Sequence, residues 1–85
     1  MHAEFVIKSC FSLPSLGVLV SGEVTEGSVE EGAQGKTPLG KLVTLVRLDI
    51  KGVPIKSAHA KDKISIVLKG INITDVHPGM NINFF

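Results

Sequence analysis

Apolar and polar side chains alternate along much of this chain, with a period of two residues. The alternation is clearest in residues 5–11, 17–24 and 63–69. A period of two is typical of β-strands that bury one face. Ten Val and eight Ile are spread over nearly the whole sequence, and β-branched side chains favour strands over helices. The pattern predicts an all-β protein in which no segment requires a helix.

Each predicted strand has one face that we expect to enter the core. The inward sets of four strands are Phe5, Ile7 and Phe11; Val18, Val20 and Val24; Ile64, Ile66 and Leu68; and Met80, Ile82 and Phe84. Gly22 interrupts the second set, which predicts a β-bulge or the close approach of another backbone. Further strands are expected around Ser28 and Val29 and over residues 53–57.

Residues 41–51 form the one segment whose apolar positions also fit helical spacing. A strand is favoured because the segment is rich in β-branched residues and lies between Gly40 and Gly52. Its expected faces are Leu42, Thr44, Val46, Leu48 and Ile50 on one side, with Arg47 and Asp49 opposite.

Glycine and proline mark the connections between the strands. Pro14 and Gly17 predict a turn over residues 13–17, and residues 32–40 are predicted to form a loop. Five glycines fall at expected chain reversals: Gly17, Gly27, Gly32, Gly70 and Gly79. Six or seven short strands suggest a small closed barrel or a sandwich, and closure removes the edges that such a sheet would expose.

The length of 85 residues predicts one domain that spans residues 1–85. A hydrophobic fraction of 44% with 20% charged residues is typical of globular proteins, and no apolar run approaches the length of a membrane span. Cys10 is the only cysteine, which excludes an internal disulfide and a zinc site with several thiolates. Residues 1–11 lack the pattern of a signal peptide, so we expect a cytoplasmic protein that does not bind membranes.

Residues 11–27, FSLPSLGVLVSGEVTEG, resemble the opening of the second domain of the translational GTPases, typified by elongation factor Tu. That family has F-x-I-x-G-x-G-T-V-V-T-G-x-V, followed by a glycine, a short strand and a second glycine, as at Gly27 and Gly32 here. Residues 60–71 and 75–80 are similar to its A-x-x-G-x-x-V, L-x-G-I and D-I-x-x-G-x-V segments. The resemblance implies a closed six-stranded antiparallel β-barrel, in agreement with the strand pattern.

The departures from this family bear on function. Leu16 and Glu23 stand where many members have arginine, Lys61 replaces a glycine, and residues 33–40 replace a compact G-D-x-V segment. If the family meets RNA phosphates with that face, the loss of two positive charges weakens the inference that this chain does the same.

No catalytic, cofactor-binding or metal-binding residue is predicted, so we do not expect an enzyme. Gly35-Lys36-Thr37 is similar to the end of a P-loop, but Glu30 stands at the position of the leading glycine, and the guanine motif N-K-x-D does not occur. Any GTP hydrolysis is therefore expected from another polypeptide. The three histidines are isolated, and Asp62 and Asp75 fall in predicted turns, where a carboxylate usually caps its own backbone.

Charge is distributed unevenly along the sequence. Residues 1–35 carry a net charge of −4 and residues 36–85 a net charge of +5. Six basic residues of the second part are candidates for binding RNA phosphates: Arg47, Lys51, Lys56, Lys61, Lys63 and Lys69. The alternative, which the frequency of solvated charge runs favours, is that they are scattered charges on the outer face of a barrel. Tyr and Trp are absent from the sequence, so stacking on single-stranded bases has little support.

Two functions follow from these observations. The first is a noncatalytic translation-factor-like module that binds RNA or a ribonucleoprotein, such as transfer RNA or the ribosome, through the basic half. The alternative is a protein-interaction barrel that pairs with itself or with another protein, such as a GTPase. Its contacts would be apolar residues such as Leu16, Leu19, Phe84 and Phe85.

Overall fold

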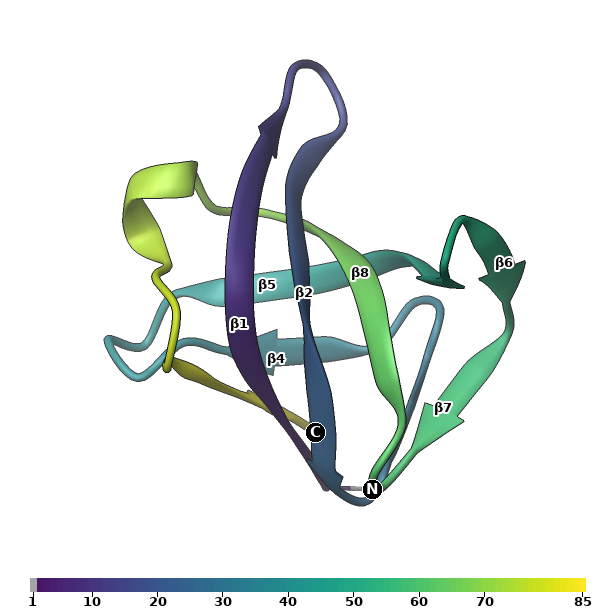
Figure 1. Ribbon diagram of the computed structural model, residues 1–85. Coiled ribbons are helices and arrows are strands. Elements are labelled where there is room, and N and C mark those ends of the chain that lie inside the picture. The colour runs from purple at the N-terminus through teal and green to yellow at the C-terminus, as the bar shows by residue number, and fades with distance from the viewer. Residues whose placement is uncertain (1) are drawn as a thin grey trace.

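The computed structural model describes residues 2–85 and consists almost entirely of β-strands (Figure 1). The strands are β1 (Ala3–Leu13), β2 (Gly17–Glu26), β3 (Ser28–Glu30), β4 (Gln34–Lys36), β5 (Leu42–Ile50), β6 (Val53–Ile55), β7 (Ser57–His59), β8 (Lys63–Lys69) and β9 (Asn81–Phe84). Within residues 2–85 the helical content is one 3₁₀ turn, η1 (Ile73–Asp75). No helix in this range is long and apolar enough to cross a membrane.

Six of the strands close into an antiparallel barrel. Their order is β4-β9-β1-β2-β8-β5, and a further pairing between β4 and β5 completes the ring. Strand β6 extends from β5 as a hairpin, while β3 and β7 form a separate two-stranded sheet. The β1–β2 hairpin projects beyond the barrel (Figure 1). The predicted all-β fold and the six-stranded closed barrel are confirmed.

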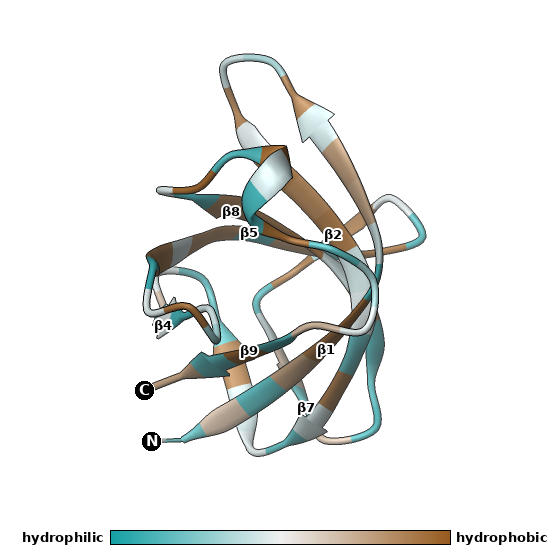
Figure 2. Ribbon diagram, turned by 90° about the vertical axis from the view of Figure 1, so that its left-hand side faces the viewer, coloured by the Kyte–Doolittle hydropathy of each residue, from teal (hydrophilic) through white to brown (hydrophobic). Residues whose placement is uncertain are grey.

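The core consists of the inward sets that the alternation predicts. Phe5, Ile7, Val18, Val20 and Val24 are at most 2% exposed. The sets from β8 and the C-terminal segment are also buried: Ile64, Ile66, Leu68, Met80, Ile82 and Phe84. Hydrophilic and hydrophobic residues alternate along these strands (Figure 2). Each fully buried apolar side chain stabilises the fold by about 1.5–3 kcal/mol.

The prediction that Phe11 joins the core is wrong. The pairing of β1 with β2 shifts register between Ile7 and Ser9. An extra residue at this point reverses the direction of every later side chain in the strand. Phe11 consequently faces outward and is 55% exposed, and Lys8 is exposed on the outside of the barrel.

The predicted faces of residues 41–51 are also wrong, although the strand itself is confirmed. Val43 and Leu45 are buried, and a register shift between Leu45 and Arg47 then brings Leu48 into the core. Of the set expected to share one buried face, Leu48 alone is buried; Leu42, Thr44, Val46 and Ile50 are not. The bulge breaks the period of two on which the assignment depended.

Residues 32–40 are not a simple loop, because they contain β4, the strand that closes the barrel. Gly35 lies so close to β9 that a Cβ atom there would sit 2.6 Å from the carbonyl oxygen of Asn83. The P-loop-like Gly35-Lys36-Thr37 is therefore part of the barrel wall and its edge. Residues 53–57 likewise divide between β6 and β7, which belong to different sheets.

Gly22 confirms the predicted close approach of another backbone. It lies opposite the β1 bulge, where a Cβ atom would come 1.9 Å from the carbonyl oxygen of Val6. Glycine is required there because the neighbouring atom belongs to a strand and cannot move aside without breaking the ladder.

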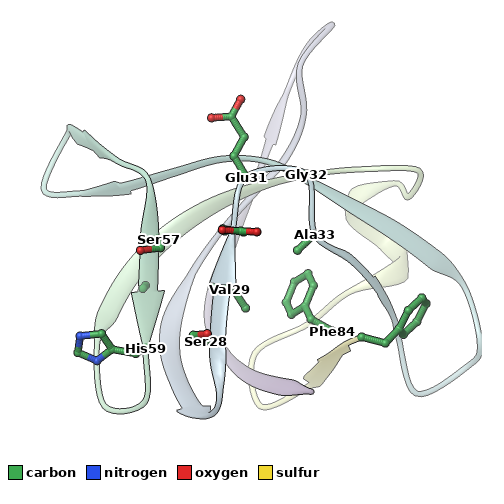
Figure 3. Close-up of a pocket in the computed structure, with 11 residues that line it drawn as sticks. Ser28, Val29, Glu31, Gly32, Ala33, Ser57, His59 and Phe84 are labelled. Carbon is green, nitrogen blue, oxygen red and sulfur yellow. The ribbon is translucent and has the colours of Figure 1, made fainter. Parts of the chain in front are cut away.

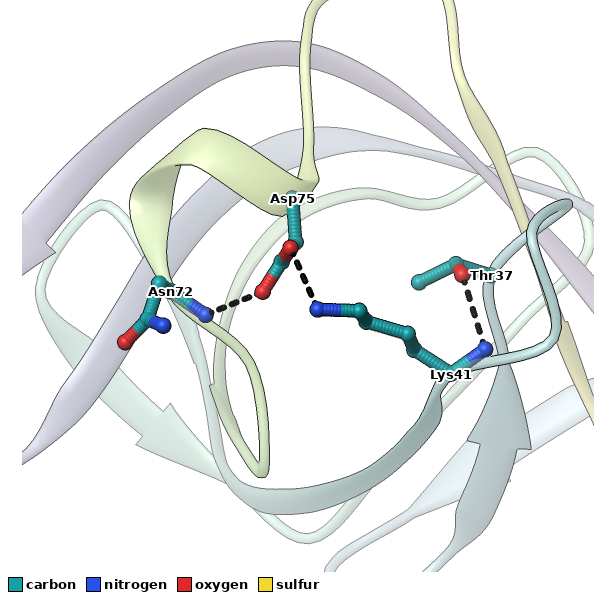
Figure 4. A network of polar contacts seen from close by, with 4 residues as sticks. All are labelled: Thr37, Lys41, Asn72 and Asp75. Atoms are coloured by element: carbon teal, nitrogen blue, oxygen red, sulfur yellow. Dashed lines mark hydrogen bonds and ion pairs between the residues drawn. The ribbon is translucent and has the colours of Figure 1, made fainter.

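A polar network fastens the β4–β5 connection to η1 (Figure 4). The hydroxyl of Thr37, a buried residue, accepts a hydrogen bond from the backbone N–H of Lys41 at 3.2 Å. The Lys41 ammonium contacts Asp75 at 2.7 Å, and the other Asp75 oxygen accepts the backbone N–H of Asn72 at 2.7 Å. The Asn72 N–H and then Lys41 hold the pKa of Asp75 below its ordinary value.

Replacing Gly22 by Ala tests the backbone approach. We expect Gly22→Ala to lower the free energy of unfolding by about 3 kcal/mol, since the new methyl group meets a backbone atom. The control is Gly52→Ala: φ there is +84° and nothing lies within 4 Å, so only the conformational cost of about 1 kcal/mol remains. Urea denaturation measures both losses. Equal losses would contradict the account of Gly22.

Replacing Asp75 by Asn tests the polar network through its pH dependence. A carboxylate with a lowered pKa stabilises the fold above its ordinary pKa of about 4, and this stabilisation disappears as the pH falls through the lowered value. We expect Asp75→Asn to lower the melting temperature at neutral pH, and the two proteins to converge in acid. A difference in melting temperature that persists unchanged at low pH would refute the role of the charge.

Candidate functional site

The outer face of β2, β8 and β5 carries two hollows. Across this face Leu19 pairs with Val67 and Val67 with Arg47, and one step along the strands Ser21 pairs with Ser65. The Ser21 and Ser65 hydroxyls are hydrogen-bonded at 2.9 Å. This serine pair separates an apolar hollow on the side of the β1–β2 hairpin tip from a basic hollow on the other side.

The first hollow, the apolar groove, has a volume of about 440 Å³. It is lined by Leu13, Leu16, Leu19, Val46, Val67, Arg47, Asp49 and Lys69. Val46 reaches the groove because the β5 bulge follows Leu45. Arg47 Nε lies 3.9 Å from an oxygen of Asp49, a long ion pair in which the arginine side chain is exposed and the aspartate side chain is mostly covered. The groove is therefore an apolar surface with basic residues at its border.

The second hollow, the lysine hollow, has a volume of about 340 Å³. Its lining residues are Lys8, Lys51, Lys63, Ser21, Ser65, Gly22, Ile50 and Ile64. The three lysines come from β1, the β5–β6 turn and β8. The lining contains no carboxylate within residues 2–85, although Glu23 pairs with Lys63 at the neighbouring position. Three like charges around one hollow favour an anion.

The structure divides the six predicted basic residues among three places. Lys51 and Lys63 line the lysine hollow, while Arg47 and Lys69 border the apolar groove. Lys56 and Lys61 line neither and lie in the connections on either side of β7. Lys8 is the member that sequence reasoning missed, because it belongs to the acidic half of the chain. The glycine opposite it on β2, which allows the bulge, was the available signal.

A third hollow, the acidic pocket, lies between the small sheet and the C-terminal strand. It measures about 490 Å³ and is lined by Ser28, Val29, Glu30, Glu31, Gly32, Ala33, Ser57, Ala58, His59, Phe84 and Phe85. Val29 lies between the β7 residues and Phe84 (Figure 3). Two exposed glutamates make this pocket unfavourable for phosphate.

The apolar residues of the alternative function do not form one surface. Phe84 is 2% exposed and closes the barrel interior, so it is not available for a partner. Phe85 is 59% exposed but lines the acidic pocket, whereas Leu16 and Leu19 line the apolar groove. A protein partner that binds one of these hollows would not contact the apolar residues of the other.

The titratable side chains outside these hollows have structural roles. Asp62 accepts the backbone N–H of His59 and Asp75 that of Asn72, which confirms the predicted turn caps. Burial raises the pKa of the Cys10 thiol, which disfavours the nucleophilic thiolate. Ligand atoms of His2, Glu4 and Glu26 lie within 4.8 Å of one another. All three residues are exposed or half-buried, and such surface groupings occur without an ion.

The chain is similar in sequence and in fold to known proteins. No protein-family model matches the sequence. GTP-binding protein 1 of Xenopus laevis is 30% identical over 83 residues, which span 92% of this chain and 13% of that protein. The chain therefore covers about one eighth of the length of this relative.

Solved structures give a closer match in shape. Translation elongation factor SelB from Methanococcus maripaludis, in its apo form, superposes with a TM-score of 0.90 at 17% identity, over 98% of this chain and 18% of that one. A bacterial selenocysteine-specific elongation factor, EF-Sec, superposes with a TM-score of 0.84 at 26% identity, over 94% of this chain and 14% of that one. The matched part of these factors is a β-barrel rather than a GTPase domain. The resemblance seen in the sequence is confirmed, and the chain is a β-barrel of the translation-factor type.

Proposed function

We propose that this chain is a noncatalytic module of the translation-factor type that contacts RNA or a ribonucleoprotein, such as transfer RNA or the ribosome, in the cytoplasm. The observation that carries the proposal is the lysine hollow. Lys8, Lys51 and Lys63 reach it from three separate segments and meet around one depression. The proposal that the module is of the translation-factor type is supported by the similarity to elongation factors and to a relative named as a GTP-binding protein.

The electrostatics of the hollow favour phosphate. Within residues 2–85 the three lysines have no ion-pair partner, whereas Lys41 and Arg47 elsewhere do. Among the residues that the structure describes, three lysine side chains and no carboxylate line the hollow, so an anion that enters it is attracted by all three charges. A lysine is a flexible point charge, which suits contact with a backbone that presents phosphates at variable positions.

The position of the hollow accounts for the departures from the translational GTPases. Leu16 and Glu23 stand where many members of that family have arginine. Leu16 lines the apolar groove, so an apolar side chain stands there in place of a cation. Lys8 supplies a charge elsewhere on the same face, through the bulge in β1. The proposed contact is thus displaced away from the hairpin tip.

The proposed contact is with phosphates rather than with bases. None of the lining residues of the lysine hollow is aromatic, and the sequence has no Tyr or Trp. Contacts to phosphate position a protein on RNA without selecting its sequence. We therefore expect binding that depends strongly on salt and weakly on base sequence.

The triple variant Lys8→Gln, Lys51→Gln, Lys63→Gln tests the hollow. Each lysine that contacts a phosphate contributes about 0.7–0.9 to the slope of log affinity against log salt. We expect the triple variant to lower that slope by about 2 and to weaken binding at low salt. Filter binding to transfer RNA and to ribosomal subunits over a salt series measures both quantities.

A matched control removes the same charge elsewhere. Lys36→Gln, Lys56→Gln, Lys61→Gln changes three exposed lysines that line neither hollow of this face. This control should keep the slope of the unmodified protein. Equal losses in both triple variants would mean that diffuse charge, not the hollow, binds RNA. No binding by the unmodified protein at low salt would refute the RNA function itself.

A further inference from the structure

The apolar groove is a surface with an unusual make-up for the outside of a barrel. Val67 points away from the core, opposite to Ile66 and Leu68, yet it is only 6% exposed. Its cover comes from neighbours in the groove, among them Leu13, Leu16 and Leu19. Large apolar depressions bordered by polar residues on small proteins usually mark binding sites.

We propose that the apolar groove binds an acidic amphipathic segment of a partner protein. Leucine and valine side chains from four strands and from the hairpin tip supply the apolar floor. A volume of about 440 Å³ accommodates several apolar side chains of one short segment. This site goes beyond the proposed RNA function, because the serine pair separates it from the lysine hollow.

The charges at the border of the groove indicate the sign of the partner's charge. Two of the three charged residues of the groove are basic, Arg47 and Lys69. Asp49 lies 3.9 Å from Arg47 and offsets part of that charge, while Lys69 has no acidic partner within residues 2–85. Carboxylates next to the apolar anchors of the segment would pair with these border residues.

Two other occupants fit the groove less well. A second copy of this chain on a twofold axis would present the same groove, whose carboxylate, Asp49, would have to balance the Arg47 and Lys69 of the other copy. RNA would place phosphates against five aliphatic side chains and would gain no stacking from them. An amphipathic protein segment with acidic residues can pack its apolar side chains on the floor and pair its carboxylates with the basic border residues.

The test uses a defined probe peptide and methyl NMR. The peptide is acetylated, carries Leu at helical spacing on one side and Glu on the other, and is titrated into the full chain. We expect methyl shifts at Leu19, Val46 and Val67 and none at Leu39, which is 82% exposed and lies outside the groove. A peptide in which Lys replaces every Glu should bind at least about tenfold more weakly at low salt.

Variants separate the groove from the rest of the face. Leu16→Glu changes a residue that is 57% exposed in a turn, so the barrel should still fold, as circular dichroism will check. It should weaken peptide binding at least about tenfold, as a lost anchor would, while Leu39→Glu leaves it unchanged. Binding to transfer RNA should not change in Leu16→Glu, which makes failure of this site distinguishable from failure of the RNA function.

Several results would overturn the proposal. These are no methyl shift at any peptide concentration reached, equal binding of the acidic and basic peptides, or equal effects of Leu16→Glu and Leu39→Glu. Loss of RNA binding in Leu16→Glu would assign the groove to RNA instead. Sedimentation equilibrium showing a dimer that Leu16→Glu dissociates would assign it to a second copy.

Discussion

Closure of the barrel by β4 is the constraint on which the rest of the structure depends. Only Gln34, Gly35 and Lys36 form this strand, yet it pairs with β5 on one side and β9 on the other. Without it the other five strands would be an open sheet with two exposed edges around an uncovered core. Gly35 makes the closure tight, because β9 leaves no room for a side chain at that position. Thr37 and Lys41 then hold the chain that leaves β4.

A ring of six strands must curve strongly, and the ladders of β1 and β5 contain register shifts. One falls between Glu4 and Phe5, one at Lys8 and one after Leu45. A bulge increases the local bend and also reverses the faces of the residues that follow. Lys8 and Val46 are the extra residues at two of these shifts, and each lines one hollow of the outer face. Both hollows of this face therefore lie beside a bulge.

This explains how far the sequence could predict the molecule. The period of two identified β2, β8 and β9 and their inward residues, because β2 and β8 pair without a shift over residues 18–23 and the inward residues of β9 alternate regularly. It failed after Ile7 and Leu45, where an inserted residue changes the period without any change in residue type. Strand β4 escaped prediction because Gln34, Gly35 and Lys36 have no apolar alternation. Four of the six predicted basic residues line the two hollows, but Lys8 was missed, because the grouping depends on strand neighbours far apart in sequence.

The two hollows can serve different partners because the serine pair divides their chemistry. Ser21 and Ser65 satisfy each other through one hydrogen bond, so the boundary between the hollows is neutral and needs neither partner. The lysine hollow offers three cations beside Ile50 and Ile64, and the apolar groove offers five aliphatic side chains with two cations and one carboxylate at its border. The electrostatic attraction between the lysines and RNA phosphates acts over a distance that shortens as the ionic strength rises. Apolar side chains contribute only when the two surfaces are in contact. The two proposed contacts therefore lie side by side on one face and depend on different physical interactions.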